Sequence, residues 1–314
     1  MAPSPIDVSD LVVSYGRGAK RTAAVRGVSF RVDEGECVGF IGANGAGKST
    51  TIKALMGFVF PESGSVKVYG RTPGDAESRR RIGYLPEVAL YYPFMKAREL
   101  LELYGGLSGM GAAEVRAKAP ALLEQVGLAG CGERLLRTFS KGMQQRLGIA
   151  QALLADPDLL ILDELSSGLD PLGRAGLRTV LQAARKAGKT IFFSSHELTE
   201  VEALCDRVVM IHQGRIVRDA PVSDLIRPLN RYEVTFAGLA GEPAGWPDPV
   251  RTRDPRRDGA DQWTLETDSI EAYTEVLEAI RSADGEVRRA VSKSISLEDD
   301  FIRLVQGGTE AAAG

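Results

Sequence analysis

A glycine-rich segment, GANGAGKS at residues 42–49, constrains the fold of this chain more than any other feature of its sequence. The short apolar run Glu36–Ile41 precedes it and predicts a buried strand. Residues 49–58 follow with apolar side chains at helical spacing, which predicts a helix. A turn between a strand and a helix aims several backbone N–H groups at one point, and the helix N-terminus adds a partial positive charge. The segment is therefore predicted to bind an anion.

The segment matches the P-loop pattern GxxxxGKS, which indicates a nucleoside triphosphate site when it lies between a strand and a helix. Gly42, Gly45 and Gly47 let the backbone approach phosphate oxygens and adopt positive φ. Lys48 is predicted to reach the β- and γ-phosphates, and Ser49 to offer its hydroxyl to Mg²⁺. The other predicted contacts are Asn44, Ala46 and Thr50. The alternative, an ordinary glycine turn that caps a helix, explains the complete pattern poorly.

Two adjacent acidic residues, Asp163 and Glu164, follow the apolar run Leu159–Leu162, which predicts a buried strand. At this position Asp163 is expected to hold the Mg²⁺ through its water shell. Glu164 is expected to polarise the attacking water as the general base for attack on the γ-phosphate. The alternative is that two acids merely end a strand at a solvated turn, which is a poor explanation beside a P-loop.

A histidine, His196, follows the predicted strand Thr190–Ser194 in the segment FFSSHE. Ligands of open α/β sheets collect at the carboxyl ends of the strands. His196 is therefore expected to contact the γ-phosphate and the attacking water. An isolated histidine is more often a surface or packing residue, but its position at a strand end favours the functional role.

Predicted strands alternate with helices along most of the chain, which favours an α/β fold with a mainly parallel core sheet. An antiparallel β part is expected at the N-terminus, and helix-forming stretches predict a helical subdomain over about residues 88–155. The composition changes near Pro221. We therefore predict a nucleotide-binding domain over residues 1–221 and a small C-terminal α+β accessory domain over residues 222–314. Its predicted strands and helices are Tyr232–Phe236, Gln262–Glu266, Ile270–Ile280 and Leu297–Leu304.

Composition excludes several classes of protein. The 39 basic and 42 acidic residues give a formal net charge of −3, so no nucleic-acid partner is expected. The three cysteines are widely spaced and lack CxxC pairing, which fits a reducing cytosol better than a disulfide framework or a zinc site. No window approaches 18 uninterrupted apolar residues, and the N-terminus lacks a signal-peptide pattern. The chain is therefore expected to be neither exported nor membrane-spanning by itself.

The segment Phe139–Arg146, FSKGMQQR, resembles the LSGGQ signature of the ABC ATPases, a stretch that ordinary P-loop enzymes lack. Ser140 and Gly142 match this signature, whereas Lys141 replaces a glycine and Met143 replaces the usual glutamine or glycine. The alternative, Ser140 as the N-cap of the following helix, is compatible with the same role. In the family, the serine and this helix N-terminus face the γ-phosphate held by the other subunit. The resemblance thus implies that Ser140 and Gly142 contact ATP.

Further resemblances to the family extend over residues 6–220 in matching order and spacing. Tyr15 resembles the aromatic residue that stacks on adenine, although a tyrosine at a strand end is more often a packing residue. LLILDE resembles the Walker B motif, SGLD at Ser167–Asp170 resembles the D-loop, and His196 resembles the switch histidine. These matches imply a P-loop NTPase fold of the ABC ATPase type.

The chain departs from the family pattern at two positions. Leu165 and Ser166 stand where proline and threonine are common. Glu87, in IGYLPE, stands where a glutamine usually senses Mg²⁺ and the membrane partner. A carboxylate still offers an oxygen to the metal or the water, so Glu87 is expected to contact both the nucleotide site and the metal.

The resemblance implies an ATP-binding and ATP-hydrolysing subunit of an ABC transporter. Two copies, or one copy and a related subunit, are expected to close head-to-tail on ATP and to drive a separate transmembrane permease. IGYLPE and SKGM together resemble the ATPases of ABC-2-type exporters, and the ending SLEDDFIRLV is similar to their tails. The protein is thus expected on the cytoplasmic face of the membrane, held there by its permease.

Two other readings remain. A soluble ABC ATPase without a membrane partner is the alternative, but the chain has one P-loop, no long heptad arm and no net basic charge. A kinase that uses the same P-loop fails to explain FSKGMQQR followed by LLILDE and SSGLDP.

Overall fold

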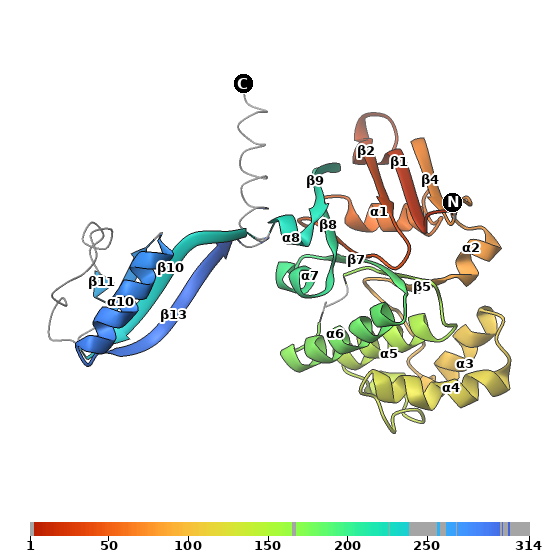
Figure 1. Cartoon of the computed structure of the whole chain (residues 1–314). Helices are drawn as coiled ribbons and strands as arrows, with labels where there is room; N and C mark the ends of the chain where they lie inside the picture. Colours follow the sequence, from red (N-terminus) through yellow and green to blue (C-terminus); the bar gives the residue numbers. More distant parts are fainter. Residues whose placement is uncertain are drawn as a thin grey trace. The chain divides into compact units, whose positions relative to one another are not determined.

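The computed structural model describes residues 3–164, 168–225, 227–238, 256–257, 262–267, 269–295, 297 and 301. The chain divides into two compact units, Met1–Val222 (unit 1) and Ser223–Gly314 (unit 2) (Figure 1). Each unit has a sheet and a hydrophobic core of its own.

The central element of unit 1 is a six-stranded sheet in the order β5-β6-β7-β3-β8-β9. Neighbouring strands from β5 to β8 run parallel, and β9 runs antiparallel to β8. The side chains of β3, β6 and β7 are buried throughout, as expected for strands covered on both faces. The strands are β3 (Cys37–Ile41), β5 (Ile82–Leu85), β6 (Leu159–Leu162), β7 (Thr190–Ser195), β8 (Arg207–His212) and β9 (Arg215–Pro221).

A second, antiparallel sheet of unit 1 has the order β2-β1-β4, with β1 at Ile6–Tyr15, β2 at Thr22–Val32 and β4 at Ser63–Val68. A hydrophobic core cluster joins this sheet to helix α1 and to one face of the parallel sheet. Within it Phe30, Phe40 and Phe192 pack with ring centroids 5.4 to 5.6 Å apart. The predicted combination of a parallel core sheet and an N-terminal antiparallel part is confirmed.

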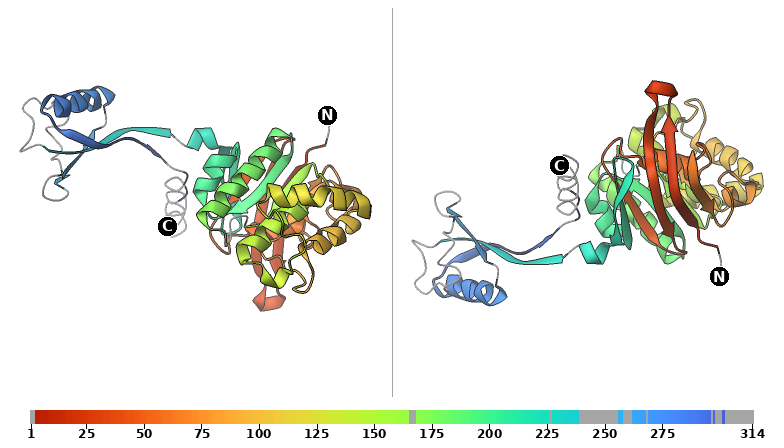
Figure 2. Two further views of the ribbon diagram at one scale, coloured as in Figure 1. Left: turned by 90° about the horizontal axis from the view of Figure 1, so that it is seen from below. Right: turned by 90° about the horizontal axis from the view of Figure 1, so that it is seen from above.

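Helices α3 to α6 lie on the opposite side of the parallel sheet from the antiparallel sheet (Figures 1 and 2). Helices α3, α4 and α5 pack on one another and form the predicted helical part. Among the described residues, no helix combines the length and apolarity needed to cross a membrane. The helices of this part of the chain are α1 (Lys48–Leu55), α2 (Ala76–Arg80), α3 (Ala97–Leu107), α4 (Ala112–Gln125), α5 (Lys141–Leu153), α6 (Pro171–Lys186), α7 (Leu198–Leu204) and α8 (Val222–Leu225).

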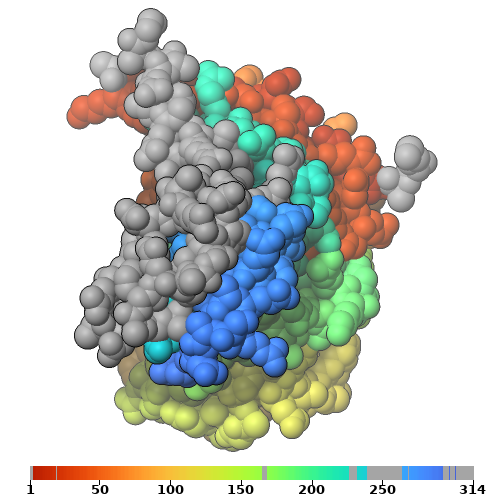
Figure 3. Space-filling view, turned by 60° about the vertical axis from the view of Figure 1, so that its left-hand side comes forward, coloured from red at the N-terminus to blue at the C-terminus, as the bar shows by residue number. Residues whose placement is uncertain are grey.

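Unit 2 is an antiparallel sheet in the order β11-β12-β10-β13, covered by helix α10 (Figure 3, blue). Its elements are β10 (Arg227–Ala237), β11 (Arg256–Arg257), β12 (Gln262–Thr267), α10 (Ile270–Ser282) and β13 (Glu286–Ile295). The core contains Phe236 from β10, Leu265 from β12, and Val276 and Ile280 from α10. The sequence does not predict β13, and most of the helix predicted at Leu297–Leu304 lies outside the described residues.

Candidate active site

The glycine-rich segment forms the turn between β3 and α1, as predicted. Gly45 and Gly47 have φ values of 79° and 114°, a region that residues with a Cβ rarely adopt. A Cβ on Gly47 would lie 2.7 Å from the carbonyl oxygen of Ala24 in β2. Gly47 is also the N-cap residue of α1, so the loop leads directly into the positive end of that helix. The glycines therefore permit the close packing that positions this helix N-terminus.

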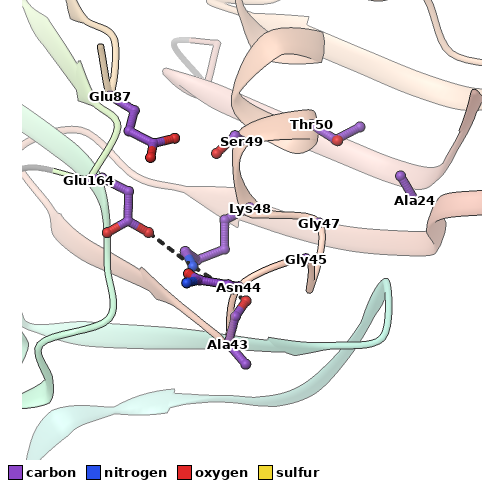
Figure 4. Close-up of a pocket in the computed structure, with 10 residues that line it drawn as sticks. All are labelled: Ala24, Ala43, Asn44, Gly45, Gly47, Lys48, Ser49, Thr50, Glu87 and Glu164. Atoms are coloured by element: carbon purple, nitrogen blue, oxygen red, sulfur yellow. Dashed lines mark hydrogen bonds and ion pairs between the residues drawn. The ribbon is translucent and has the colours of Figure 1, made fainter.

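A cavity of about 390 Å³ opens over the turn (Figure 4). Most of its lining comes from the P-loop, and Glu164 and Glu87 face it from the ends of β6 and β5. The lining residues are Ala24, Ala43, Asn44, Gly45, Gly47, Lys48, Ser49, Thr50, Glu87 and Glu164. Backbone amides, one cation and acidic groups thus meet around one space, which suits a phosphate chain that arrives with a divalent cation.

Lys48 is the buried cation of this cavity, with 5% of its surface exposed. Its Nζ donates a hydrogen bond to the carbonyl oxygen of Gly42 at 2.7 Å and forms an ion pair with Glu164 Oε1 at 3.0 Å. A buried charge requires such partners because desolvation is costly. A phosphate that enters the cavity therefore competes with Glu164 for the ammonium of Lys48.

Asp163 lies directly after β6 and is buried. It is not among the residues that line the cavity, but it contacts Ser49, which is. Its Oδ1 accepts hydrogen bonds from Ser194 Oγ at 2.6 Å and from Ser49 Oγ at 3.3 Å. Burial raises the pKa of Asp163 above its ordinary value, although these two hydrogen bonds oppose the shift. Asp163 and Ser49, which are both predicted to take part in a Mg²⁺ site, therefore lie within hydrogen-bond distance of each other.

Glu164 connects Lys48 with His196. Its Oε2 lies 2.6 Å from His196 Nδ1, while Oε1 pairs with Lys48. Burial alone would raise the pKa of Glu164, but the hydrogen bonds to His196 and Lys48 outweigh it and the pKa lies below its ordinary value. The carboxylate is therefore ionised at neutral pH, which is the state that accepts a proton.

His196 follows β7 directly, and 53% of its side chain is exposed. The parallel course of β6 and β7 brings the residues after both strands to the same edge of the sheet. Lys48, the acidic pair Asp163 and Glu164, and His196 come from three distant parts of the sequence and lie together at this edge, as the strand-end argument predicts.

Tyr15, Ser140 and Gly142 do not line this cavity. Tyr15 lies at the end of β1, 44% exposed, and its hydroxyl is 3.5 Å from Thr50 Oγ1. Ser140 is the N-cap of α5, where its Oγ accepts a hydrogen bond from the Met143 N–H at 3.2 Å. Leu165, Ser166 and Ser167 lie outside the described residues, so the predicted D-loop is described only from Gly168 onward.

Three residues at the site are not among the predicted contacts: Ala24, Ala43 and Ser194. Ala43 lies within the predicted P-loop and lines the cavity beside Asn44. Ala24 lines the cavity from β2, and no local pattern distinguishes this alanine from its neighbours. Ser194 binds both Asp163 and the backbone of Glu164. Its position at the end of a predicted strand, two residues before His196, is the signal that could have identified it.

Comparison with known proteins agrees with this geometry. Residues 25–167 match the ABC transporter family. An uncharacterised ABC transporter ATP-binding protein, all4389 of Nostoc sp. strain PCC 7120, is 38% identical over 321 residues, covering 97% of this chain and 90% of the relative. The Nod factor export ATP-binding protein I of Paraburkholderia xenovorans strain LB400 is 34% identical, with 97% and 98% covered.

The solved structure of an ATP-binding subunit of an ABC transporter is also similar to this chain. It has a TM-score of 0.64 at 35% identity and covers 71% of this chain and 92% of the solved one. The shared family, the shared fold and a P-loop that faces a paired glutamate and histidine lead to one assignment. The chain belongs to the ATP-binding proteins of ABC transporters, the ATP-hydrolysing subunits that dimerise and work with transmembrane permeases.

Proposed function

We propose that this protein is the ATPase of an exporter, held on the cytoplasmic face of the membrane by a separate permease. The main supporting observation is that Glu87 lines the phosphate cavity and is followed directly by a segment with exposed apolar side chains. The full-length similarity to a Nod factor export ATP-binding protein supports the direction of transport. The resemblance of IGYLPE and FSKGMQQR to ABC-2-type exporters supports it as well.

Lys48 and the backbone of the P-loop bind the β- and γ-phosphates in this proposal. When a γ-phosphate takes the ammonium of Lys48, Oε1 of Glu164 loses its present partner and becomes available to a water molecule. Oε2 stays with His196, which fixes the direction of the carboxylate. Glu164 then accepts the proton of the water whose oxygen attacks the γ-phosphorus, and ADP leaves.

The residues around the cavity fit Mg²⁺, which prefers oxygen ligands. Ser49 Oγ and Asp163 Oδ1 already lie 3.3 Å apart, and Glu87 adds a carboxylate to the same cavity. We assign Ser49, Asp163 and Glu87 as the residues that hold the ion with the nucleotide. When bound, Mg²⁺ would neutralise charge on the β- and γ-phosphates.

Two further contacts complete the proposed nucleotide site. Tyr15 is assigned to the adenine ring, because its exposed ring lies at the end of β1 and its hydroxyl reaches Thr50 beside the cavity. Ser140 and Gly142, at the N-terminus of α5, are assigned to the γ-phosphate held by a second copy of the chain. In this arrangement each ATP joins two subunits, and hydrolysis releases them.

The permease is proposed to dock on the segment 88–94, between β5 and α3. Four large apolar side chains there are strongly exposed: Val88 (65%), Leu90 (89%), Tyr92 (68%) and Phe94 (74%). An exposed group of this kind marks an interaction surface. Because Glu87 directly precedes this segment and lines the cavity, a permease seated on the segment is linked directly to the nucleotide site.

Affinity capture from detergent-solubilised native membranes tests this proposal. The full chain carrying Glu164→Gln is used with Mg²⁺ and ATP, so that the ATP-bound state accumulates, and its companions are identified by mass spectrometry. A polytopic membrane protein is the expected companion. Recovery of ribosomal or DNA-bound proteins alone would instead favour a soluble ATPase with a role outside transport.

A matched pair of surface variants sharpens this experiment. Leu90→Asp introduces a charge into the proposed docking segment and is expected to abolish capture of the membrane protein. Ile270→Asp changes an apolar residue of unit 2 that is 55% exposed and is expected to leave capture unchanged. Equal loss in both variants would contradict docking on segment 88–94.

A further inference from the structure

The hydroxyl of Ser194 makes two hydrogen bonds that join neighbouring strands at the active site. Ser194 lies near the carboxyl end of β7 and is fully buried, with 0% of its surface exposed. Its Oγ donates a hydrogen bond to Asp163 Oδ1 at 2.6 Å and accepts one from the N–H of Glu164 at 2.8 Å. One hydroxyl thus contacts the side chain of one acidic residue and the backbone of the next.

The backbone at Glu164 needs this support. Its φ is 50°, in the left-handed region that residues other than glycine enter only where their surroundings hold them. The bond from its N–H to Ser194 Oγ fixes this turn immediately after β6. The direction of the Glu164 carboxylate toward Lys48 and His196 follows from the same turn.

Asp163 also depends on Ser194 for its orientation. The hydrogen bond from Ser194 to Asp163 Oδ1 is shorter than the one from Ser49, at 2.6 Å against 3.3 Å. A residue that hydrogen-bonds a metal-binding carboxylate fixes the direction of that ligand, and loss of such a residue typically weakens metal binding 10- to 100-fold. Ser194 itself is not one of the residues that line the cavity.

We propose that Ser194 is a positioning residue for ATP hydrolysis, which orients Asp163 for the divalent cation and holds the backbone turn that aims Glu164. The proposal rests on the functions assigned above to Asp163 and Glu164. It predicts a defect in metal binding and in turnover, and no defect in the binding of metal-free nucleotide, because Ser194 does not contact the P-loop.

The neighbouring Ser195 provides a matched control. It is equally buried, at 0% exposed, and its hydroxyl also makes two hydrogen bonds. Both of these go to the backbone of Glu197: Oγ accepts from the N–H at 2.9 Å and donates to the carbonyl oxygen at 3.4 Å. Successive residues of a strand point to opposite faces, so Ser195 lacks the contacts of Ser194 with the two acidic residues.

The test measures Mn²⁺ affinity, with Mn²⁺ as the probe for the Mg²⁺ site, on the full-length chain saturated with ADP. Ser194→Ala is expected to weaken Mn²⁺ binding by about 10- to 100-fold, and Ser194→Thr, which keeps the hydroxyl, to recover most of the loss. ADP affinity measured in EDTA is expected to remain at the wild-type value in both variants, which also verifies folding. Ser195→Ala is expected to keep wild-type Mn²⁺ affinity.

Some outcomes would contradict the role of Ser194, and another would contradict the metal-binding role of Asp163. Wild-type Mn²⁺ affinity in Ser194→Ala, or a loss no larger than in Ser195→Ala, would overturn the role of Ser194. If Ser194→Thr weakens Mn²⁺ binding as much as Ser194→Ala does, side-chain shape rather than the hydroxyl matters, and the proposed role of Ser194 is also wrong. Asp163→Asn is measured in parallel. If Asp163→Asn keeps wild-type Mn²⁺ affinity, the metal-binding role assigned to Asp163 is wrong. If only Ser194→Ala keeps wild-type affinity, the role of Ser194 is wrong and that of Asp163 is retained.

Discussion

The main sheets of the two units differ in whether neighbouring strands run parallel or antiparallel. This difference determines whether residues that follow different strands can form one active site. In unit 1, strands β3, β5, β6 and β7 run parallel, so the residues that follow them all reach one edge of the sheet. In unit 2, the described strands all pair antiparallel, so successive strands end at opposite edges of the sheet. A parallel sheet therefore gathers residues that are distant in sequence, which an antiparallel sheet does not do.

The cores of the two units differ as well. The parallel sheet of unit 1 contains strands that are buried throughout, and its phosphate site is supported by packing on several sides. The described part of unit 2 has one cluster, formed between its sheet and α10. We therefore expect nucleotide chemistry to depend on unit 1 alone and unit 2 to unfold with little effect on it.

The largest effect is expected from Glu164→Gln in unit 1. The substitution keeps the shape of the side chain but removes the base, and positioned acid–base catalysis supplies roughly 10² to 10⁴ in rate. ATP turnover at saturating Mg²⁺ and ATP should fall by about that factor. ATP binding should persist, because the amide no longer competes with phosphate for Lys48 as an ion-pair partner.

Lys48→Ala provides the contrast to that variant. It removes the buried cation of the cavity and should weaken ATP binding itself, by the roughly 1.5 to 3 kcal/mol typical of hydrogen bonds to charged groups. Calorimetric titration with ATP separates the two variants. If both lost binding equally, or if both kept wild-type turnover, the roles assigned to the two residues would be wrong.

A core substitution in unit 2 should have a large effect on stability and a small one on activity. Phe236 is 1% exposed, and Phe236→Ala is expected to destabilise unit 2 by roughly 3 to 5 kcal/mol. Differential scanning calorimetry should show this loss of stability in one unfolding transition. ATP turnover should stay within about twofold of wild type, because Phe236 belongs to the core of unit 2 and substitutions at independent sites are nearly additive.

The matched substitution in unit 1 is Phe192→Ala. Phe192 is fully buried in β7 and packs on Phe30 of β2 and on Phe40 of β3, the strand that leads into the P-loop. Its loss is expected to lower both stability and turnover. A fall in turnover with Phe236→Ala as large as with Phe192→Ala would mean that unit 2 takes part in the ATPase cycle, for example as a dimer contact.

The smallest expected effects come from the serines at the N-termini of α5 and α10, one in each unit. Ser140 caps α5 in unit 1 and Ser269 caps α10 in unit 2, and each Oγ accepts a backbone N–H at 3.2 Å. Substitution of either by alanine should cost about 1 kcal/mol of stability. Only Ser140→Ala is expected to weaken ATP-dependent dimerisation, measured by light scattering in the Glu164→Gln background. Equal dimerisation in the two variants would contradict the role assigned to Ser140.

Features set by local sequence are predicted well. The observed bounds of β6 are those expected from sequence, because the strand is a clear local run of apolar residues. Helix α3 lies within the predicted helical subdomain, which its helix-forming residues indicate. The P-loop lies between its strand and helix for the same reason. The meeting of Asp163, Glu164 and His196 is predicted because parallel strands share a carboxyl edge.

Features set by contacts between distant segments are not predicted. Strand β13 contains Arg288 and Arg289, which interrupt an apolar alternation, and its pairing with β10 defines it. Ser194 and Asp163 are 31 positions apart in sequence, and their bond depends on the register of β6 and β7. The ion pair of Lys48 with Glu164 likewise has no local signature.

The central claim is that unit 1 supplies every residue of the nucleotide site except those that a second copy of the chain contributes. The most direct test is ATP affinity of a fragment of residues 1–222, measured by calorimetric titration beside the full chain, with circular dichroism to verify its fold. The account predicts affinities that agree within about twofold and loss of binding when the fragment carries Lys48→Ala. A folded fragment that fails to bind ATP, or that binds it equally well with Lys48→Ala, would contradict the claim.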